Sequence, residues 1–588
     1  MDIGLNISPN FISQLLSNGN KYRDRAAYRY FQNNSWISVS WRAFIHHIKQ
    51  FASALLNHGI KAGEHVAIYA ANSPQWTEID YACMATKTVS IAIHSTVSQQ
   101  SLQQIIDETE PRLVFAGNAE LAKKLEGLLK PQQVVLLNGS LPGCQTLSQF
   151  AGTAPREDWC RAADEITPDD LWTIVYTSGT TGKMRGAMLT YGNIDHQISA
   201  HRQVLPDLSD SDSSFCLLPL SHIFERGWSA IQYAWGLTHH YCPAGPQIIE
   251  AIKSAHPSVI CVVPRILEKI YLSFNEHLER LPKLSRTLLK RSLEAGKKYA
   301  ALVAEDKKPN CWLRAQHALL DKFIFAKVRS LLGGKLKHCV VGSAALVPDV
   351  HEFFRAIGIF INDGYGLTET TATISSTPLG HSIPNTVGTP LGGIEIRLGE
   401  NDEIQVKGPN VMRGYYRNAE ETAKVFTADG FFRTGDVGQF LPNGYLRITD
   451  RLKDFIRTST GKYVAPQHLE SLLCMSPYID QAAIVGEGRS WIGALVVPDF
   501  KKLQNLAEQL GIQAAKIQDM LRNSELINYI QQQIDAILKD EAKHEQVHKI
   551  ALLEHPFTTD NGELTPTLKL RRKTISEHYR ETIEALFA

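Results

Sequence analysis

The sequence predicts an α/β protein in two parts. The larger is an N-terminal domain of doubly wound α/β sheets with a small β-barrel-like layer, and the smaller is an α+β C-terminal domain. Its 588 residues are too many for a single hydrophobic core. Strand and helix patterns alternate along the first part, and short strands with frequent glycines then occupy residues 388–448. We therefore expect domains at residues 1–450 and 451–588.

Composition excludes several classes of protein. Hydrophobic residues make up 44% of the chain and charged residues 21%, which is ordinary for a globular protein. A net charge of +1 gives no general attraction to nucleic acid. The nine cysteines include no C-x-x-C pair, so neither zinc nor disulfides are indicated, and a cytoplasmic location fits best. No signal peptide or bilayer-spanning run is visible, so any membrane contact is expected to be peripheral.

The first elements are a hairpin, a helix and a βαβ pattern. Aromatic and β-branched runs flank Asn33-Asn34 and predict two strands joined by a turn. Ser40 then begins a helix. One face of that helix carries Phe44, Ile48, Phe51 and Leu55. A strand at residues 65–70, a helix at 75–87 and a strand at 89–93 continue the chain in the doubly wound pattern.

Hydroxyls, glycines and cations crowd the loop Tyr176–Gly186, which reads YTSGTTGKMRG. It follows a predicted buried strand, and a second strand is expected after it. Glycines let backbone N–H groups approach an anion closely, so we expect a polyphosphate ligand. The loop differs from a Walker A loop because only two residues separate its glycines and Met184 follows the lysine. The candidate phosphate-binding residues are Thr177, Ser178, Gly179, Thr180, Thr181, Gly182 and Lys183.

Two more glycine-containing loops follow strands of a predicted βαβ unit. Strands at residues 338–341 and 359–361 flank a helix at 348–357, so the strands should be parallel. Both loops then leave the carboxyl ends of parallel strands, which is where open α/β sheets bind ligands. The candidate binding residues are Gly342, Ser343 and Ala344 in the first loop, and Asp363, Gly364, Tyr365 and Gly366 in the second.

The segment from Leu267 to Leu332 is helical and rich in leucine, lysine and arginine. One interpretation is a helical hairpin packed on the domain, with a solvated basic face. The other is a surface that meets anionic lipid head groups. The second interpretation would use Lys290, Arg291, Lys297 and Lys298.

Seven stretches in order resemble the adenylate-forming (AMP-binding) superfamily, and together they cover nearly the whole chain. The phosphate loop is the first. The others are LPLSHIFERGW (218–228), VGSAAL (341–346), DGYGLTET (363–370), FRTGDVG (432–438), ITDRLKDFI (448–456) and LTPTLKLRR (564–572). FERGW, the helical insert and LTPTLK look most like the long-chain fatty acyl-CoA synthetase branch.

The resemblance implies that ATP activates a long-chain fatty acid to acyl-AMP with release of pyrophosphate. The acyl group is then transferred to coenzyme A, giving acyl-CoA and AMP. Two anions must meet in the first step, so their charge has to be offset. The resemblance assigns Glu369 and Thr177 to Mg²⁺ and Thr368 to the α-phosphate. It further assigns Tyr365 to adenine stacking, Asp436 to the ribose hydroxyls and Arg451 to a second nucleotide contact.

Four further roles follow from the resemblance. Lys569, in LTPTLK, is expected to reach the active site during adenylation, and the tail domain is expected to rotate before the thiol step. Lys453 matches the hinge of that rotation, and Gly461 matches a glycine beside the pantetheine channel. His222 is expected near the carboxylate end of the acyl pocket. The helix after it, with Trp228, Tyr233 and Trp235, is expected to wall the acyl tunnel, although core packing is the expected duty of at least two of these aromatic residues.

Alternatives remain open at this point. Another acid-activating ligase, such as an acyl-AMP ligase that feeds a carrier protein or an aryl-CoA ligase, would share these stretches. A catalytically silent sensor of acyl-CoA or ATP is a third hypothesis. The chain departs from the family where Met184-Arg185 replaces the usual Pro-Lys, and where Asp450 replaces the usual glycine. The sequence leaves open monomer or homodimer and the preferred chain length.

Overall fold

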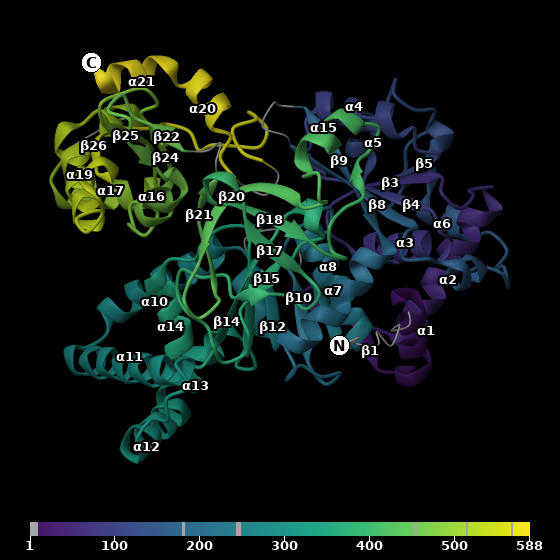
Figure 1. Ribbon diagram of the computed structural model, residues 1–588, viewed down its shortest axis with the longest axis horizontal. Helices are drawn as coiled ribbons and strands as arrows, with labels where there is room; N and C mark the ends of the chain where they lie inside the picture. Colours follow the sequence, from purple (N-terminus) through teal and green to yellow (C-terminus); the bar gives the residue numbers. More distant parts are fainter. Residues whose placement is uncertain (1–9, 179–182, 243–247, 452–454, 513–515, 566–568) are drawn as a thin grey trace.

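The computed structural model describes residues 10–178, 183–242, 248–451, 455–512, 516–565 and 569–588. The N-terminal part holds two large sheets side by side, and the tail forms a separate lobe (Figure 1). This arrangement confirms the predicted α/β fold class, with a large first domain and a smaller second one.

The first sheet has the strand order β19-β9-β8-β4-β3-β5-β6-β7. Parallel pairing joins β8, β4, β3, β5, β6 and β7, and β9 is antiparallel to β8. The strands are β3 (His65–Tyr69), β4 (Val89–Ile93), β5 (Leu113–Ala116), β6 (Val134–Leu136), β7 (Gln145–Thr146), β8 (Leu171–Ser178), β9 (Met184–Thr190) and β19 (Gly414–Tyr415). A strand follows the phosphate loop as predicted, and the structure shows that the two strands are antiparallel neighbours.

The second sheet has the order β16-β15-β14-β13-β12-β10-β11-β1-β2. Its strands are β1 (Ala26–Gln32), β2 (Ser35–Ser40), β10 (Ser213–Cys216), β11 (Thr238–Tyr241), β12 (Val259–Val262), β13 (His338–Val341), β14 (Phe360–Tyr365), β15 (Ser375–Ser376) and β16 (Thr389–Pro390). β13 and β14 are parallel, which confirms the predicted βαβ unit. β1 and β2 form the predicted hairpin.

β10 ends at Cys216, and the Leu218 amide after it donates to the Glu225 carboxyl at 2.9 Å. The predicted bounds of two loops were wrong. The phosphate loop was expected over Tyr176–Gly186, but β8 continues to Ser178 and β9 begins at Met184. The strand expected to stop at Ile361 continues to Tyr365. Its last residues, predicted as a loop, pair antiparallel with β15 through Gly364 and Tyr365.

Helices cover both sheets. The N-terminal ones include α1 (Phe11–Tyr22), α2 (Trp41–Asn57), α3 (Pro74–Ala85), α4 (Gln99–Thr109), α7 (Tyr191–Val204), α8 (Ile223–Trp235), α9 (Ile248–Ala255), α10 (Pro264–Arg280) and α14 (Pro348–Ala356). The Ser40 side chain caps α2 at the Ala43 amide, and the four predicted apolar residues of that helix are buried. The first turn of α14 begins with Pro348, which suits a helix start because that N–H has no helical partner.

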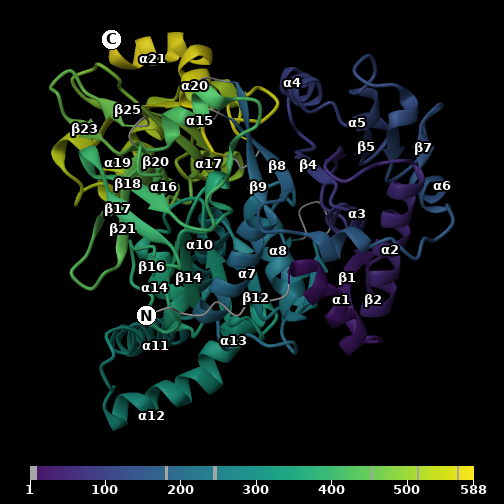
Figure 2. The ribbon, with the colours of Figure 1, turned by 45° about the vertical axis from the view of Figure 1, so that its right-hand side comes forward.

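The segment predicted to be helical and basic leaves the body as an arm. It comprises α11 (Lys283–Ala304), α12 (Cys311–Leu320), a π-helical turn (Asp321–Phe325) and α13 (Ala326–Arg329). Two views place α12 at the outer edge of the molecule (Figures 1 and 2). No helix among the described residues combines the length and apolarity needed to cross a bilayer.

The remaining strands form the predicted small β-layer and the tail. The layer is antiparallel, in the order β17 (Glu395–Leu398), β18 (Glu403–Lys407), β20 (Phe432–Phe440), β21 (Leu446–Arg451). The tail contains the hairpin β22 (Ile456–Arg457)–β23 (Tyr463–Val464) and the sheet β24 (Ile479–Val485), β25 (Ile492–Pro498), β26 (Val547–Leu552). Its helices include α16 (Pro466–Leu473), α17 (Phe500–Gln509), α18 (Ile517–Leu521), α19 (Ser524–Ile537), α20 (Arg572–His578) and α21 (Arg580–Phe587).

Candidate active site

Tyr365 and Asp436 meet although they lie on different sheets. Tyr365 ends β14, Asp436 lies on β20, and the Tyr365 hydroxyl donates to Asp436 Oδ2 at 2.7 Å. Asp436 also pairs with Arg451 in the β20–β21 ladder, so the backbone places these two predicted nucleotide residues opposite each other. The aromatic ring and carboxylate expected to bind adenine and ribose therefore form one unit.

Glu369 lies in the short 3₁₀ helix η5 (Thr368–Thr370), directly after Thr368. Its Oε1 accepts a hydrogen bond from the Tyr415 hydroxyl at 2.9 Å. Burial and the negative charge of Glu369 raise the pKa of Tyr415, so the phenol keeps its proton and acts as the donor. Tyr415 belongs to no stretch that the sequence singled out, because nothing in RGYY indicates a partner 46 residues away.

Arg185, one of the two departures in the phosphate loop, contacts Tyr415. Its Nη2 lies 2.7 Å from Glu421 Oε2, and its guanidinium lies 5.6 Å from the centre of the Tyr415 ring. Thr177 sits opposite Arg185 in the β8–β9 ladder. The arginine therefore links the strand that carries the phosphate loop to α15 (Ala419–Val425), rather than remaining an unattached loop cation.

The phosphate loop itself is described in part. Thr177 is half-buried and its hydroxyl donates to the Arg185 carbonyl at 3.5 Å, while Lys183 is exposed. For Ser178 only the backbone is described, at the end of β8. Gly179, Thr180, Thr181 and Gly182 lie outside the described residues.

Close packing requires two of the predicted glycines, Gly342 and Gly366. A Cβ on Gly342 would lie 2.9 Å from the Phe224 ring, and one on Gly366 would lie 1.7 Å from the Ala372 carbonyl oxygen. Ser343 adopts φ 75°, and it precedes Ala344 in an exposed turn. Gly364 pairs with Ser376 in the sheet.

Asp363 was predicted as a binding residue, but its carboxylate already has a partner. His351 Nε2 lies 3.0 Å from Asp363 Oδ2 and 2.7 Å from the Ser382 hydroxyl, and all three residues are buried. The Asp363 side chain therefore fastens β14 to α14.

Lys569 is brought to the N-terminal domain by the tail. Burial, the nearby His94 and the positive charge of Lys569 together lower the pKa of His222 to about 3, and burial has the largest effect. The His222 imidazole is thus neutral at pH 7, with Lys569 close enough for its charge to act. The lysine loop is closed by two hydrogen bonds, from the Lys569 amide to the Thr565 hydroxyl at 3.0 Å and from the Thr565 amide to the Lys569 carbonyl at 2.8 Å.

Charge pairs hold the tail against α10. Arg265 Nη2 and Lys269 Nζ lie 3.3 and 3.4 Å from Asp480 Oδ1, and Lys502 forms an ion pair with Glu276. Arg265 also donates to the carbonyl oxygen of Cys474 at 3.2 Å. All of these bonds join the two domains through partly exposed side chains, where each ion pair contributes little to stability.

The helix α8 is fixed by its own motif, FERGW. Arg226 is buried, donates to Asp80 on α3 and to Thr173 on β8, and lies over the Trp172 ring at 4.5 Å. A buried arginine needs such a partner set because an unpaired charge in the interior is strongly unfavourable. The Arg226–Asp80 pair therefore positions His222 and Phe224 at the start of α8.

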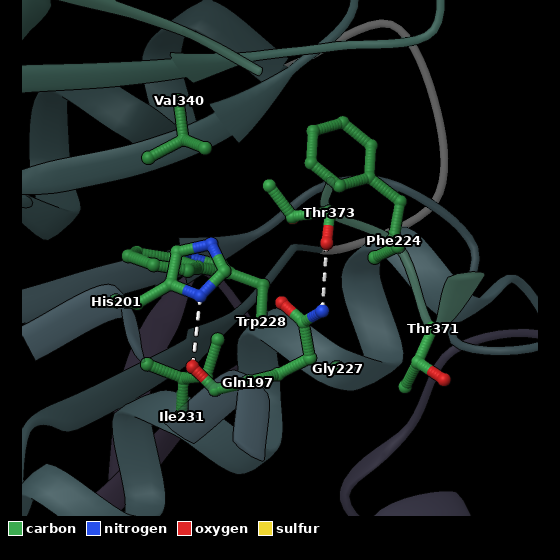
Figure 3. Close-up of a pocket in the computed structure, with 10 residues that line it drawn as sticks. Gln197, His201, Phe224, Gly227, Trp228, Ile231, Val340, Thr371 and Thr373 are labelled. Carbon is green, nitrogen blue, oxygen red and sulfur yellow. Dashed lines mark hydrogen bonds between the residues drawn. The ribbon is translucent and has the colours of Figure 1, made fainter. Parts of the chain in front are cut away.

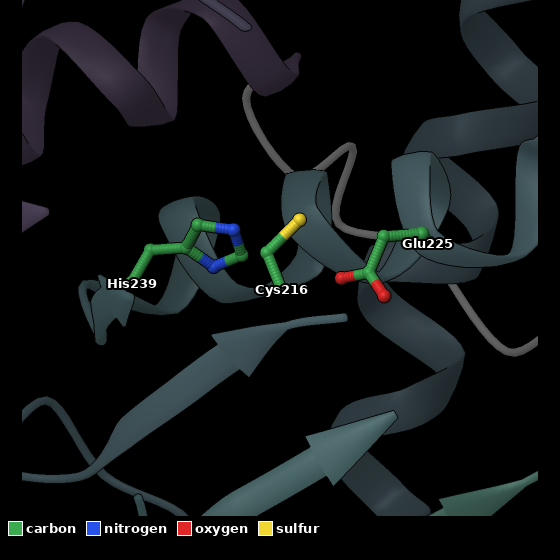
Figure 4. Close-up of side chains that lie close together, drawn as sticks. All are labelled: Cys216, Glu225 and His239. Atoms are coloured by element: carbon green, nitrogen blue, oxygen red, sulfur yellow. The ribbon is translucent and has the colours of Figure 1, made fainter. Parts of the chain in front are cut away.

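Cys216 on β10, Glu225 on α8 and His239 on β11 present their polar atoms within 4.8 Å of one another (Figure 4). The Gln232 side-chain oxygen lies 2.7 Å from His239 Nδ1 and can only accept, so Nδ1 carries the proton. Burial raises the pKa of Glu225 to about 8, so this carboxyl is neutral at pH 7. Together with the bond from the Leu218 amide, the cluster fastens the loop that carries His222 to α8.

A narrow cavity lies on the other side of α8 (Figure 3). Its walls are largely apolar, and Gln197 closes one side by donating to the Thr373 carbonyl at 2.8 Å. Phe224 borders both this cavity and the Gly342 loop, so the cavity adjoins the nucleotide residues. The apolar lining residues are Phe224, Gly227, Trp228, Ile231, Val340 and Ala372.

The aromatic residues of α8 divide as expected. Trp228 borders the cavity. Tyr233 packs in the core between Phe44 and Tyr81, and Trp235 lies under the Arg202 guanidinium at 4.1 Å. Core packing is therefore the duty of two of the three.

One predicted residue of the tail, Gly461, stays outside this cluster of contacts. Gly461 is exposed in the β22–β23 hairpin with φ 78°, and its amide closes the turn on the Thr458 carbonyl. A left-handed turn of this kind favours glycine. Lys453 lies outside the described residues.

Two α/β sheets, glycine loops at their carboxyl ends and a lysine supplied by a second domain define an adenylating enzyme. The chain belongs to the family of AMP-binding enzymes, whose model matches residues 15–416. The model of the AMP-binding enzyme C-terminal domain matches residues 453–588.

Comparison with known proteins shows which AMP-binding enzymes this chain resembles. The chain is 31% identical to the long-chain-fatty-acid–CoA ligase FadD15 of Mycobacterium bovis, with 96% of this chain and 94% of that protein covered. It is also 31% identical to long-chain-fatty-acid–CoA ligase 1 of Cavia porcellus, with 91% and 80% covered. The adenylation domain of the carboxylate reductase of Mycobacterium chelonae shares the fold, with a TM-score of 0.79, 22% identity, and 99% and 92% covered.

Proposed function

We propose that this protein is a long-chain-fatty-acid–CoA ligase that works in two steps. In the first, a carboxylate oxygen of the fatty acid attacks the α-phosphorus of ATP, and the bond to the bridging oxygen of pyrophosphate breaks. In the second, the thiolate of coenzyme A attacks the acyl carbon, and AMP leaves. The observation that carries the proposal is that Lys569 of the tail comes close enough to His222 for its charge to act there, at the start of the helix whose Phe224 borders an apolar cavity.

The roles follow from where the groups lie. Lys569 offsets negative charge on the attacking carboxylate and the bridging oxygen. His222 is neutral, so it borders the carboxylate without adding charge. Tyr365 and Asp436 hold adenine and ribose, with Arg451 opposite. The side chains that line the cavity beside α8 form a wall of the acyl tunnel.

Glu369 and Thr177 suit Mg²⁺, which prefers oxygen ligands and is commonly bound by one or two carboxylates together with substrate phosphates. When bound, the ion would neutralise phosphate charge. Tyr415 holds the Glu369 carboxylate in place, and Thr368 donates to the α-phosphate. Each of these groups keeps its place through bonds inside the N-terminal domain.

The tail at residues 451–588 moves between the two steps. Lys453 lies at the hinge, and Gly461 borders the pantetheine channel after rotation. Breaking the charge pairs on α10 removes Lys569 and opens room for coenzyme A. We place the enzyme in the cytoplasm, with peripheral contact to a membrane.

The purified protein with ATP, Mg²⁺ and coenzyme A should release pyrophosphate and form acyl-CoA from palmitate, but not from benzoate or coumarate. Benzoyl-CoA formation without palmitoyl-CoA would instead identify an aryl-CoA ligase. Acyl-AMP release without a thioester would identify a ligase that feeds a carrier protein. Both products are measured in the same reaction, together with the dependence on chain length.

A further inference from the structure

The helical arm carries the most exposed apolar side chains of the described residues. Among the large hydrophobic residues, the five with the greatest exposure, 58–87%, all lie in the arm. They are Leu284, Leu288, Trp312, Leu319 and Phe323. Large apolar side chains gathered on one projecting element indicate an interaction surface, whereas single exposed ones need no explanation.

Three of the five line one side of α12 and the turn after it. Trp312, Leu319 and Phe323 are seven and four positions apart, a spacing that places them on one helix face. The neighbouring face, with Leu313, His317 and Leu320, is half-buried, and His317 stacks on Tyr299 of α11 at 3.9 Å. α12 buries none of its own residues completely, so it is apolar toward both its neighbour and solvent.

Positive charge surrounds this face. Lys308, Arg314, Lys322 and Lys327 are exposed, and no described carboxylate lies within ion-pair distance of any of them. The only acid between Lys307 and Arg329 is Asp321, and it pairs with Arg329 at 2.6 Å. The result is an apolar stripe with a basic rim.

The basic residues of α11, which the sequence offered for lipid contact, are differently placed. Lys290 pairs with Glu279 at 2.9 Å, and Lys297 lies 3.4 Å from Glu352. Those ion pairs offset much of the charge of α11. The structure therefore moves the candidate surface from α11 to α12.

We propose that the face formed by Trp312, Leu319 and Phe323 docks on an anionic phospholipid bilayer, with Lys308, Arg314, Lys322 and Lys327 on the head groups. An amphipathic helix with a basic polar side and a tryptophan is the kind of element that lies in the plane of a membrane interface. Basic residues near the surface add attraction to anionic lipid. The inference rests on the proposed function in one respect, because a ligase of long-chain fatty acids takes a substrate that partitions into bilayers.

The test is sedimentation of the full-length protein with sucrose-loaded vesicles of phosphatidylcholine, with and without phosphatidylglycerol, in the absence of substrates. We expect the wild-type protein to pellet with the anionic vesicles and to lose binding in high salt. The triple variant Trp312→Gln, Leu319→Gln, Phe323→Gln should bind at least about tenfold more weakly. A matched triple variant of exposed residues elsewhere, Ile249→Gln, Leu510→Gln, Ile517→Gln, should bind like the wild type.

A second pair of variants tests the rim. Replacing Lys308, Arg314, Lys322 and Lys327 by Gln should weaken binding by about tenfold or more, whereas replacing Lys290, Arg291, Lys297 and Lys298 should have a smaller effect. Folding and function are checked by acyl-CoA formation from a water-soluble medium-chain acid without vesicles, which both arm variants should keep. That readout separates failure of the arm from failure of the proposed reaction.

Three outcomes would overturn the proposal. The wild-type protein could fail to pellet with anionic vesicles, or the stripe variant could pellet as well as the wild type. The third is a concentration-dependent dimer that dissociates in the stripe variant, because the face would then join two copies of the chain. Analytical ultracentrifugation without lipid decides the last case.

Discussion

The nucleotide site and the helical arm both contain large aromatic side chains, but those of the site form hydrogen bonds between distant segments and those of the arm are exposed. In the site, Tyr365 and Tyr415 each donate to a carboxylate from a distant part of the chain, 71 and 46 residues away. In the arm, Trp312 and Phe323 are exposed, and ion pairs such as Lys307–Glu305 join near neighbours. The catalytic groups of the site are therefore held by long-range bonds, whereas the outer end of the arm has mainly local ones.

This difference has a consequence for substitutions. A change in the site alters groups that several segments share, so its effect should reach the chemistry. A change on the outer face of the arm should alter binding to a surface and leave the chemistry intact. The predictions below test the first half of that contrast, beginning with the largest effect.

Lys569→Ala should reduce acyl-AMP formation by about 10²–10³-fold, because it removes a cation whose charge acts at His222, where we propose that the carboxylate binds. The thiol step, started from synthetic acyl-AMP and coenzyme A, should proceed nearly as in the wild type. Pyrophosphate release and acyl-CoA formation measure the two steps separately. Lys573→Ala on α20 is the matched control and should have little effect. Equal loss in both steps would contradict the assigned role of Lys569.

Glu369→Gln should weaken the use of Mg²⁺ and ATP, and Tyr415→Phe should reproduce a smaller part of that loss. Phenylalanine keeps the ring near Arg185 but deletes the donor to Glu369. A hydrogen bond to a charged group contributes about 1.5–3 kcal/mol, so we expect roughly a tenfold loss in kcat/KM. The half-saturating Mg²⁺ concentration should also rise. Tyr416→Phe is the control, and an unchanged Mg²⁺ dependence in Tyr415→Phe would remove Tyr415 from this role.

The sequence predicted the parts of the site that depend on local pattern. Strand periodicity and the glycine loops located the carboxyl edge of the βαβ unit, because the order of strand, helix and strand determines where those loops emerge. Tyr415 and the Arg185–Glu421 pair were missed because such contacts depend on tertiary packing. The strand β14 was drawn too short because Gly364 resembles a loop residue until β15 pairs with it.

The arm shows the opposite limit. The spacing of Trp312, Leu319 and Phe323 is that of a helix face turned toward a core, so periodicity alone would place them inside. Only the fold shows that this face has no protein layer over it. Likewise, the FERGW stretch indicated only a resemblance to one branch of the family, and the structure shows that its Arg226 and Glu225 fix α8 in place.

Glu225→Gln should have the smallest effect on activity, because burial holds the carboxyl neutral at pH 7 and glutamine has the same shape. The pKa of Glu225 is raised from 4.5 to about 8, so between those values the folded state holds a proton that the unfolded state releases. Its stabilising contribution is therefore complete below pH 4.5 and is lost as the pH rises to about 8. Over that window the wild type should lose up to about 5 kcal/mol from this group, and the variant should not. Thermal midpoints at pH 6 and 8.5 measure the difference. If both proteins lose the same stability, Glu225 is already ionised in the folded protein at pH 6, and its assigned neutral state is wrong.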